Sequence, residues 1–215
     1  MSNGCGTTIT CGSCTAPLSC GGGGVANVCG SPDQRVVIGQ IYGGGGNAGA
    51  TWTHDFVEVF NPGGVAVNLS GWSLQYSSAS GTTWQVTPLS GTVTPGRYLL
   101  VQQLPGSGGT MPLPAPDVVG NVALAAGAGE VALVRGTTAL SGACPVGGEI
   151  VDFVGYGGVS CYEGAAPAPA PSATLSVLRG AGGCADTQNN GSDFTVASPT
   201  PRNGSTAPQA CTVTP

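Results

Sequence analysis

Alternation of apolar and polar residues dominates the chain from residue 35 onward. The segment 72–78 (WSLQYSS) places Trp72, Leu74 and Tyr76 on one face of an extended chain and Ser or Gln on the other. Ten segments have this character: 35–42, 55–61, 65–71, 72–78, 83–88, 97–103, 130–136, 149–157, 173–180 and 193–196. We expect the segments 72–78 and 83–88 to pair as a hairpin. Short strands separated by turn residues predict an all-β sandwich or barrel.

The connections between these segments carry turn residues. The sequence 61–64 (NPGG) ends the second segment. The glycine run 42–47 is followed by neither Lys nor a helix, so we expect a flexible hairpin loop there instead of a phosphate-binding loop. Two Pro-rich stretches, 111–116 and 165–172, are expected to be extended loops. The core is expected to contain Val57, Val59, Trp72, Leu74, Tyr76, Leu99, Val101, Val131, Leu133, Phe153 and Phe194.

Composition excludes several classes of protein. The 215 residues include 39 Gly and 17 Pro, only 7% are charged, and Lys is absent. A helical bundle needs abundant Ala, Leu, Glu and Lys. Binding to nucleic acid needs cations to neutralise phosphates, whereas this chain has a net charge of −5. No apolar run is long enough to span a membrane. We therefore expect no nucleic-acid partner and no membrane span.

Nine cysteines fall into two groups and predict a secreted, extracellular or cell-surface protein, because disulfides persist in oxidising compartments. Residues 1–33 have too little apolar material for a core, so we expect a disulfide-stapled segment there and a β-sandwich over 34–215. A zinc site at the C-x-x-C pair is the alternative, but no second C-x-x-C follows. The N-terminal cysteines are Cys5, Cys11, Cys14, Cys20 and Cys29. Because five cannot all pair among themselves, one is free or has a partner upstream.

Candidate catalytic residues are few, and we assign none. His54 is the single histidine, so any Ser-His-Asp or Cys-His site would need it. Zinc hydrolase motifs need at least two histidines and are excluded. Glu58 lies within an apolar strand and is expected to pair with Arg202 or Arg179, since a buried charge needs a partner.

One polar segment carries a possible weak calcium site. Asp186, Gln188, Asn190 and Asp193 partly reproduce the alternating oxygen ligands of a calcium loop, although the bidentate Glu of such loops is missing. The same residue types also favour simple turns. Both interpretations stay open, and no other cofactor is expected.

Several motifs occur in an order that resembles the lamin tail domain family. They are DFVEVFNPGGVAVNLSGWSLQY (55–76), SGTVTPGRYLLV (90–101) and AGEVALVRG (128–136). The segments 39–56, 151–157 and 193–204 resemble its bacterial secreted branch, and the N-terminal segment resembles Cys-rich repeats of secreted bacterial proteins. The resemblance implies an immunoglobulin-like antiparallel β-sandwich. It also implies two disulfides, which would join Cys144 to Cys161 and Cys184 to Cys211.

The resemblance and the composition together predict a non-catalytic extracellular module for binding, adhesion or anchoring. Its partner would be a protein or a cell-surface polysaccharide. An accessory domain of a larger secreted hydrolase is the alternative. A calcium-dependent carbohydrate binder is a weaker one, with Trp52, Trp72 or Trp84 as the stacking platform; exposure of Trp52 and Trp84 would favour it.

Overall fold

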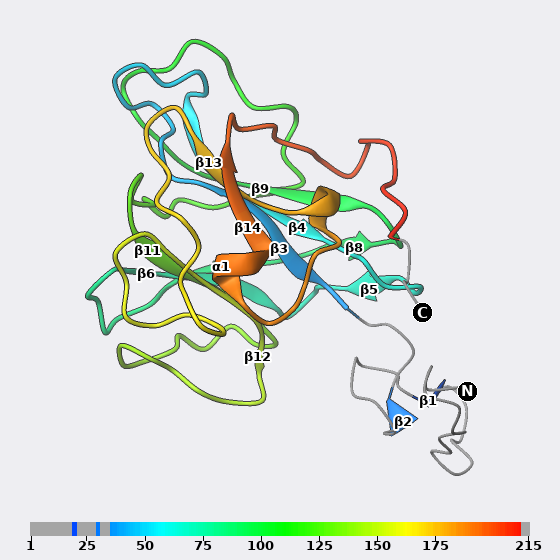
Figure 1. Cartoon of the computed structure of the whole chain (residues 1–215). Helices are drawn as coiled ribbons and strands as arrows, with labels where there is room; N and C mark the ends of the chain where they lie inside the picture. The colour runs from blue at the N-terminus through cyan, green and yellow to red at the C-terminus, as the bar shows by residue number, and fades with distance from the viewer. Residues whose placement is uncertain (1–18, 21–28, 31–34, 212–215) are drawn as a thin grey trace.

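Two antiparallel sheets packed face to face form the body of the protein (Figure 1). The computed structural model describes residues 19–20, 29–30 and 35–211. The larger sheet has the strand order β10-β9-β4-β3-β13-β14, and the smaller has the order β12-β11-β6-β7. The chain is therefore an all-β, immunoglobulin-like sandwich, as predicted.

The strand bounds follow the expected segments closely. In the large sheet they are β3 Val37–Tyr42, β4 His54–Phe60, β9 Tyr98–Pro105, β10 Val118–Val119, β13 Ser176–Arg179 and β14 Phe194–Ala197. In the small sheet they are β6 Ser73–Ser78, β7 Gln85–Pro88, β11 Gly129–Val134 and β12 Ile150–Tyr156. Nine of these ten strands fall in expected segments, the exception being β10, and the tenth expected segment, 65–71, contains the short strand Val67–Asn68. The strands β6 and β7 are paired as the expected hairpin.

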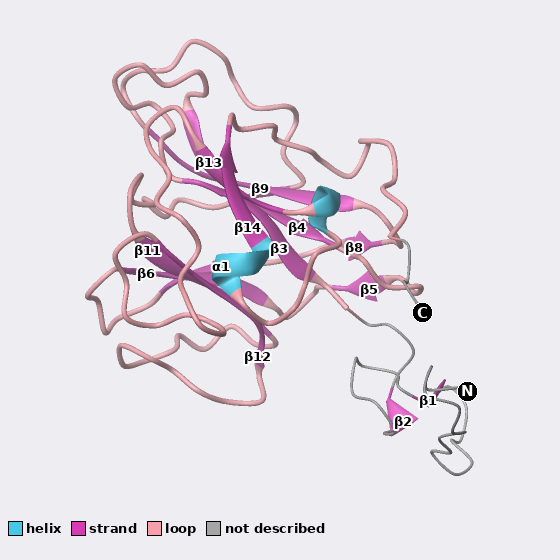
Figure 2. Ribbon diagram, viewed as in Figure 1, coloured by secondary structure: helices cyan, strands magenta, loops and turns pink. Residues whose placement is uncertain are grey.

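The remaining elements are short. A separate ribbon pairs β5 (Val67–Asn68) with β8 (Thr92–Val93), and β10 joins β9 in a two-residue parallel pair. Helical structure among residues 35–211 comprises the 3-10 turn Ala181–Gly183 and α1, Asn190–Asp193. Figure 2 shows that loops make up most of the rest. In residues 35–211 no helix has the length and hydropathy needed to cross a bilayer.

The segment 1–33 lies mostly outside the described residues, and with it the predictions for Cys5, Cys11 and Cys14. Its described part is a pair of antiparallel strands, β1 (Ser19–Cys20) and β2 (Cys29–Gly30). Their register places Cys20 opposite Cys29.

Alternating residues of both sheets fill the space between them. The inner faces contribute Val57, Val59, Leu74, Tyr76, Leu99, Val101, Val131, Leu133 and Phe194, all of them expected core residues. Trp72 packs at the edge of this cluster and is only partly buried. Phe153 is buried as expected, but it belongs to a second cluster, on the outer face of the small sheet, where it packs with Trp84 at a ring separation of 5.9 Å. Its strand is buried on both faces, so alternation alone could not assign the side.

Irregular chain covers much of both outer faces. Residues 198–211, the large-sheet cover, cross the outer face of the six-stranded sheet. Residues 136–149, the small-sheet cover, lie on the outer face of the four-stranded sheet. Each cover is held by one disulfide, Cys184–Cys211 and Cys144–Cys161 respectively. These are the two pairs that the family resemblance implies.

The expectation of a flexible loop at 42–47 was wrong, because the glycine run packs tightly against other backbone. Residues 43–46 are buried. A Cβ at Gly43 would lie 2.5 Å from the carbonyl oxygen of Ala125, and one at Gly44 would lie 2.6 Å from that of Ala173. Side chains cannot fit at such separations, so glycine is required here for close packing of backbone.

Candidate functional site

The densest cluster of charged side chains surrounds Arg179, at the end of β13. Its guanidinium is fully buried and Nη2 donates to both oxygens of Asp152 in β12, at 3.0 and 2.7 Å. Nε donates to the carbonyl of Ile38, and the group lies 4.6 Å from the ring centre of Phe194. Asp152 also accepts the backbone N–H of Ile38 at 2.5 Å. Burial raises the pKa of Asp152, and Arg179 opposes that shift. This ion pair joins the two sheets, because it links β12 of the small sheet to β13 and β3 of the large sheet.

Two of the predicted calcium ligands belong to this cluster. Asp186 accepts from Arg179 at 3.3 Å and from Arg35 at 2.8 Å. Burial favours a raised pKa for Asp186, but the two guanidinium groups hold that pKa below its usual range. Asp193 accepts the backbone N–H and hydroxyl of Thr187, at 2.9 and 2.7 Å. Both carboxylates therefore already face N–H or O–H donors.

The other two predicted ligands are also engaged in hydrogen bonds. Gln188 donates its amide N–H to Asp186 at 3.0 Å. Asn190 is fully buried, and its amide pairs with the free edge of β12: Oδ1 accepts from Gly155 N at 2.9 Å and Nδ2 donates to Phe153 O at 3.0 Å. This geometry favours the turn over the calcium loop, and calcium binding stays a prediction for experiment.

Glu163 completes the protection of the β12 edge. Its Oε1 accepts the backbone N–H of Phe153 at 3.2 Å. Burial and the neighbouring charge of Asp152 raise the pKa of Glu163 to about 8. An exposed strand edge is a template for pairing with another chain, so Asn190 and Glu163 act together as a side-chain cap on this edge.

Glu58 pairs with Arg202, one of its two expected partners. The carboxylate is fully buried in β4, while Arg202 comes from the large-sheet cover. Nη2 donates to Oε1 at 2.6 Å and Nε donates to Oε2 at 3.0 Å, a bidentate arrangement. Nη1 donates to the Tyr98 hydroxyl at 2.8 Å. Burial raises the pKa of Glu58 to about 7, and Arg202 opposes the shift. The pair anchors the cover on the sheet.

His54 and Asp55 do not form an acid–base pair. The Nδ1 atom of His54 lies 2.9 Å from the hydroxyl of Thr53. Asp55 is buried and accepts two backbone N–H groups, from Gly45 at 2.8 Å and Leu124 at 2.9 Å. Burial raises the pKa of Asp55 to about 7, against the effect of these hydrogen bonds. Its role is to tie the glycine run and the 122–126 segment to β4.

The tryptophans do not form an exposed platform. Trp84 is 6% exposed, and its Nε1 donates to Gly142 O at 3.0 Å. Trp52 is half-buried and donates to Pro199 O at 3.3 Å in the large-sheet cover. Trp72 lies beneath the guanidinium of Arg135, 5.3 Å from the ring centre. A sugar ring therefore has no free face on Trp84, and the other two rings are partly covered.

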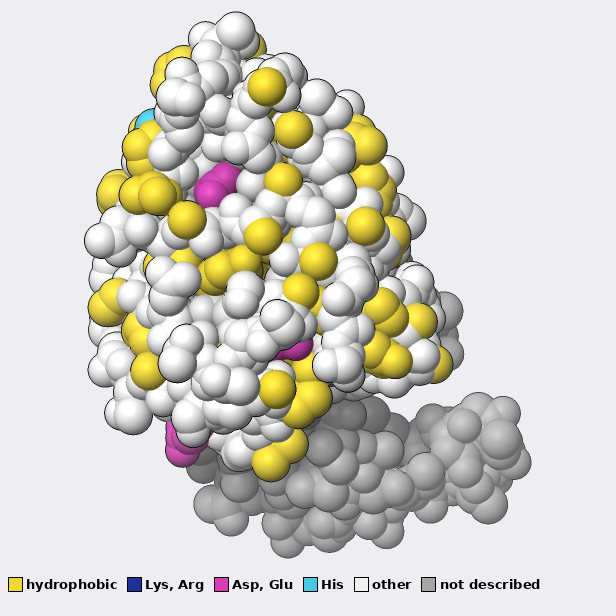
Figure 3. All heavy atoms as spheres, turned by 90° about the vertical axis from the view of Figure 1, so that its left-hand side faces the viewer, with side chains coloured by type: hydrophobic (Ala, Val, Ile, Leu, Met, Phe, Trp, Pro, Cys, Tyr) yellow, Lys and Arg dark blue, Asp and Glu magenta, His cyan; other side chains and the backbone are white. Residues whose placement is uncertain are grey.

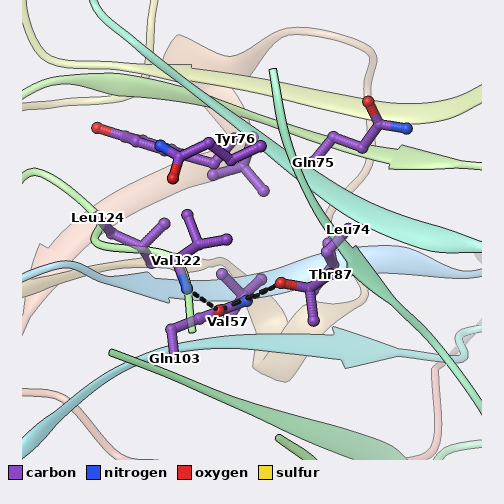
Figure 4. Close-up of a pocket in the computed structure, with 10 residues that line it drawn as sticks. Val57, Leu74, Gln75, Tyr76, Thr87, Gln103, Val122 and Leu124 are labelled. Atoms are coloured by element: carbon purple, nitrogen blue, oxygen red, sulfur yellow. Dashed lines mark hydrogen bonds between the residues drawn. The ribbon is translucent and has the colours of Figure 1, made fainter. Parts of the chain in front are cut away.

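The described part of the chain includes a small internal cavity and a surface groove. A cavity of about 10 Å³ lies between the sheets (Figure 4), and a groove of about 340 Å³ lies between the turns 62–64 and 95–96 and the end of the large-sheet cover. Neither is lined by a charged side chain. The face in Figure 3 shows only a few scattered acidic side chains and no cationic one among the described residues.

Comparison with protein families decides the classification. The family model described as Lamin Tail Domain matches residues 30–158, more than half of the chain. The chain belongs to the lamin tail domain family. This lamin tail domain has no match among curated proteins. Among solved structures, it is similar to a DUF4876 family protein from Bacteroides thetaiotaomicron, with a TM-score of 0.51 at 11% identity over 87% of this chain and 76% of the other. That likeness shows a shared fold.

The family motif has a structural explanation in this lamin tail domain. In the segment DFVEVFN, Glu58 forms the ion pair with Arg202 of the large-sheet cover, and Asn61 directly follows the last residue of β4. Asn61 is fully buried; its Nδ2 donates to Val65 O at 2.8 Å and to Val93 O at 2.7 Å, and its Oδ1 accepts from Gly63 N at 2.9 Å. Asn61 thereby holds the turn that leads to β5. The motif maintains the sandwich and its cover.

Sequence reasoning missed the partners that matter most. Asp152 lies in the segment 151–157, which was singled out only for its family resemblance, and Glu163 lies in a loop without any motif. Arg179 was considered only as an alternative partner for Glu58. A signal was available in hindsight for Asp152 alone: a carboxylate within the apolar segment 149–157 requires a buried cation.

Proposed function

We propose that this lamin tail domain is a non-catalytic extracellular module that binds or anchors a protein or a cell-surface polysaccharide. The observation that carries the proposal is the use of its charged side chains. Arg179, Arg202, Asp152 and Glu58 are committed to buried ion pairs that join strands or fix a cover. Asp55 is likewise occupied by backbone N–H groups. Groups held in this way serve the fold instead of a reaction.

Support for an extracellular location comes from the disulfides. Cys144–Cys161 and Cys184–Cys211 both fasten covers on the outside of the sheets, and neither lies between the two sheets. Such bonds persist where thiols are not kept reduced. A module with stapled loops and a weakly charged surface would recognise its partner through loop backbone, hydroxyl and apolar groups.

The proposal is tested with the intact protein in two assays. We expect no turnover of ester, phosphodiester or glycoside substrates, and co-sedimentation with isolated cell envelopes that persists at molar salt, since screening weakens only contacts between charges. Turnover that disappears in Asp55→Asn or Glu58→Gln variants of undiminished stability would contradict the non-catalytic assignment. Absence of binding both to envelopes and to protein-stripped cell-wall polysaccharide would contradict the anchoring role.

A further inference from the structure

The most exposed large apolar side chain in the described part of the chain lies in the small-sheet cover. Val146 is 94% exposed, in the connection between β11 and β12 (Figure 1). Three other large apolar side chains are exposed in that part, Val119 at 66%, Met111 at 48% and Leu104 at 40%. Val119 and Leu104 belong to strands, and Met111 exchanges backbone hydrogen bonds with the loop 51–53. Of these four residues, Val146 alone lies outside such pairing.

The backbone on either side of Val146 is also accessible. Residues 143–146 take part in no backbone–backbone hydrogen bond within the described chain. Gly147 and Gly148 follow, and a Cβ at either position would meet no described atom within 4 Å. A segment with free N–H and C=O groups can be bound in the extended form as an added strand. Residues 143–148 therefore offer an enzyme both a side chain and the main chain that carries it.

Both ends of this open segment are fixed to the body of the protein. On the preceding side, the N–H of Gly142 donates to Thr82 O at 2.9 Å, and Cys144 is held by its disulfide. On the following side, Glu149 O accepts the N–H of Arg135 at 2.8 Å, directly before β12 begins. Exposed loop tips of small residues are preferred sites of proteolytic cleavage. A protease can therefore reach the middle of this loop while the sheets stay folded.

We propose that this loop is a processing site, at which a serine protease with a small apolar specificity pocket cleaves the Val146–Gly147 peptide bond. The pocket of such a protease selects the side chain before the bond that is cut, as in elastase, and Val146 supplies a short branched apolar group. The protease serine attacks the carbonyl carbon of Val146, the bond to the Gly147 nitrogen breaks, and that nitrogen takes the proton. Water then hydrolyses the acyl-enzyme, so the products are a Val146 carboxylate and a Gly147 amine.

The cleaved protein stays in one piece, because the two parts remain bonded. The cut separates residues 1–146 from residues 147–215, and the Cys144–Cys161 disulfide joins one part to the other. The strands β11 and β12 also lie on opposite sides of the cut and keep their pairing. The product is a two-chain sandwich. Its small-sheet cover carries a new amine and a new carboxylate, in a protein of which only 7% of residues are charged.

Limited digestion of the folded full chain with pancreatic elastase tests the proposal. We expect the first cut within residues 35–211 to add about 18 Da, the mass of one water, to the unreduced protein, because the disulfide holds both parts together. Reduction should then release a polypeptide that begins at Gly147. A first cut at any other bond within residues 35–211 would overturn the proposal. So would survival of the Val146–Gly147 bond at elastase concentrations that digest the reduced, unfolded chain.

Variants separate recognition of the Val146 side chain from simple exposure of the loop. Val146→Asp should slow cleavage of this bond by at least about 100-fold, because an apolar pocket would bury the new charge without a partner. Val119→Asp, at the exposed valine of β10, is the matched control and should leave the rate unchanged. Val146→Arg should let trypsin, whose pocket contains an aspartate, cut the same bond. Unchanged elastase cleavage in Val146→Asp, or resistance of the Val146→Arg loop to trypsin, would refute the proposal.

Discussion

The two outer faces of the sandwich are covered by similar lengths of irregular chain that are held by different chemistry. The large-sheet cover is fixed by a buried ion pair, Arg202–Glu58, and by Arg97, which donates to Thr206 O at 2.5 Å. The small-sheet cover is fixed by neutral groups. Gln75 donates to Thr138 O at 2.9 Å and accepts from Leu140 N at 2.8 Å, and Trp84 binds Gly142 O.

Because one cover is held by an ion pair and the other by neutral hydrogen bonds, the two covers should respond to different substitutions. Neutral hydrogen bonds contribute modestly, and their loss leaves uncharged groups unsatisfied. Removing one member of a buried ion pair leaves an uncompensated charge, which costs more. A disulfide adds to each cover by restricting the unfolded chain. The large-sheet cover should therefore be sensitive to charge substitutions, and the small-sheet cover should not.

Arg202→Met should produce the largest effect, because it leaves Glu58 buried without its partner. We expect unfolding to become easier by about 3–5 kcal/mol. The matched change at the small-sheet cover, Gln75→Met, should cost about 1–3 kcal/mol, since it leaves only neutral groups without a partner. Urea unfolding of both variants measures the difference. Equal losses would show that the ion pair is no stronger an anchor than the amide.

Each disulfide should contribute about 3 kcal/mol, because the two bonds close loops of similar length. The sequence separations are 17 for Cys144–Cys161 and 27 for Cys184–Cys211. Replacing each pair with Ala in turn and comparing urea midpoints tests this. The two variants that each lack one disulfide should lose nearly the same free energy of unfolding. A much larger loss for one pair would indicate strain or a second role for that bond.

Glu130 should give the outer face of the small sheet a pH dependence of its own. It lies in β11 opposite Ser77, and both Oε2 of Glu130 and Oγ of Ser77 lack hydrogen-bond partners among the described residues. Burial raises its pKa from 4.5 to about 7. The unfolded chain loses this proton first, so the stability contributed by Glu130 is complete below pH 4.5 and is lost as the pH rises to about 7.

Glu130→Gln should remove that part of the pH dependence and stabilise the protein above pH 7 by about 1–3 kcal/mol. Other carboxyl groups with raised pKa values titrate in the same range, so the quantity to compare is the difference between the variant and the unchanged protein at each pH. A difference that does not vary between pH 4 and about 8 would refute a raised pKa for Glu130.

Calcium should have the smallest effect. The oxygens of Asp186 and Asp193 are occupied by donors, so we expect no change in melting temperature at millimolar calcium. A ligand that binds the folded state would raise it. A rise that Asp186→Asn abolishes would restore the calcium site predicted from the sequence, and a rise that survives this change would place calcium elsewhere.

Alternation and turn chemistry were sufficient to predict the strands of the fold. Inward residues such as Leu74 and Tyr76 alternate with polar ones, and this period defines a strand whatever covers its other face. The covers were not predictable, because a strand with polar outward residues normally faces solvent. Ser73, Gln75 and Ser77 are buried despite their polarity, since a distant loop supplies their surroundings.

The candidate site was predictable only in part for a related reason. Glu58 demanded a cation, and the sequence offers so few that Arg202 could be named. Asp186 and Asn190 are spaced like ligands, yet their partners, Arg35 and the edge of β12, are remote in the sequence. Short polar motifs specify the available atoms, whereas tertiary contacts decide what those atoms bind.

Amide hydrogen exchange of the Arg202→Met variant tests the central claim most directly, namely that charged side chains of this protein serve to hold chain onto the sheets. Comparison with the unchanged protein at pH 7 should show loss of protection for residues 198–211 and unchanged protection for residues 136–149. Unaltered protection in the large-sheet cover, or an equal loss in both covers, would contradict the account.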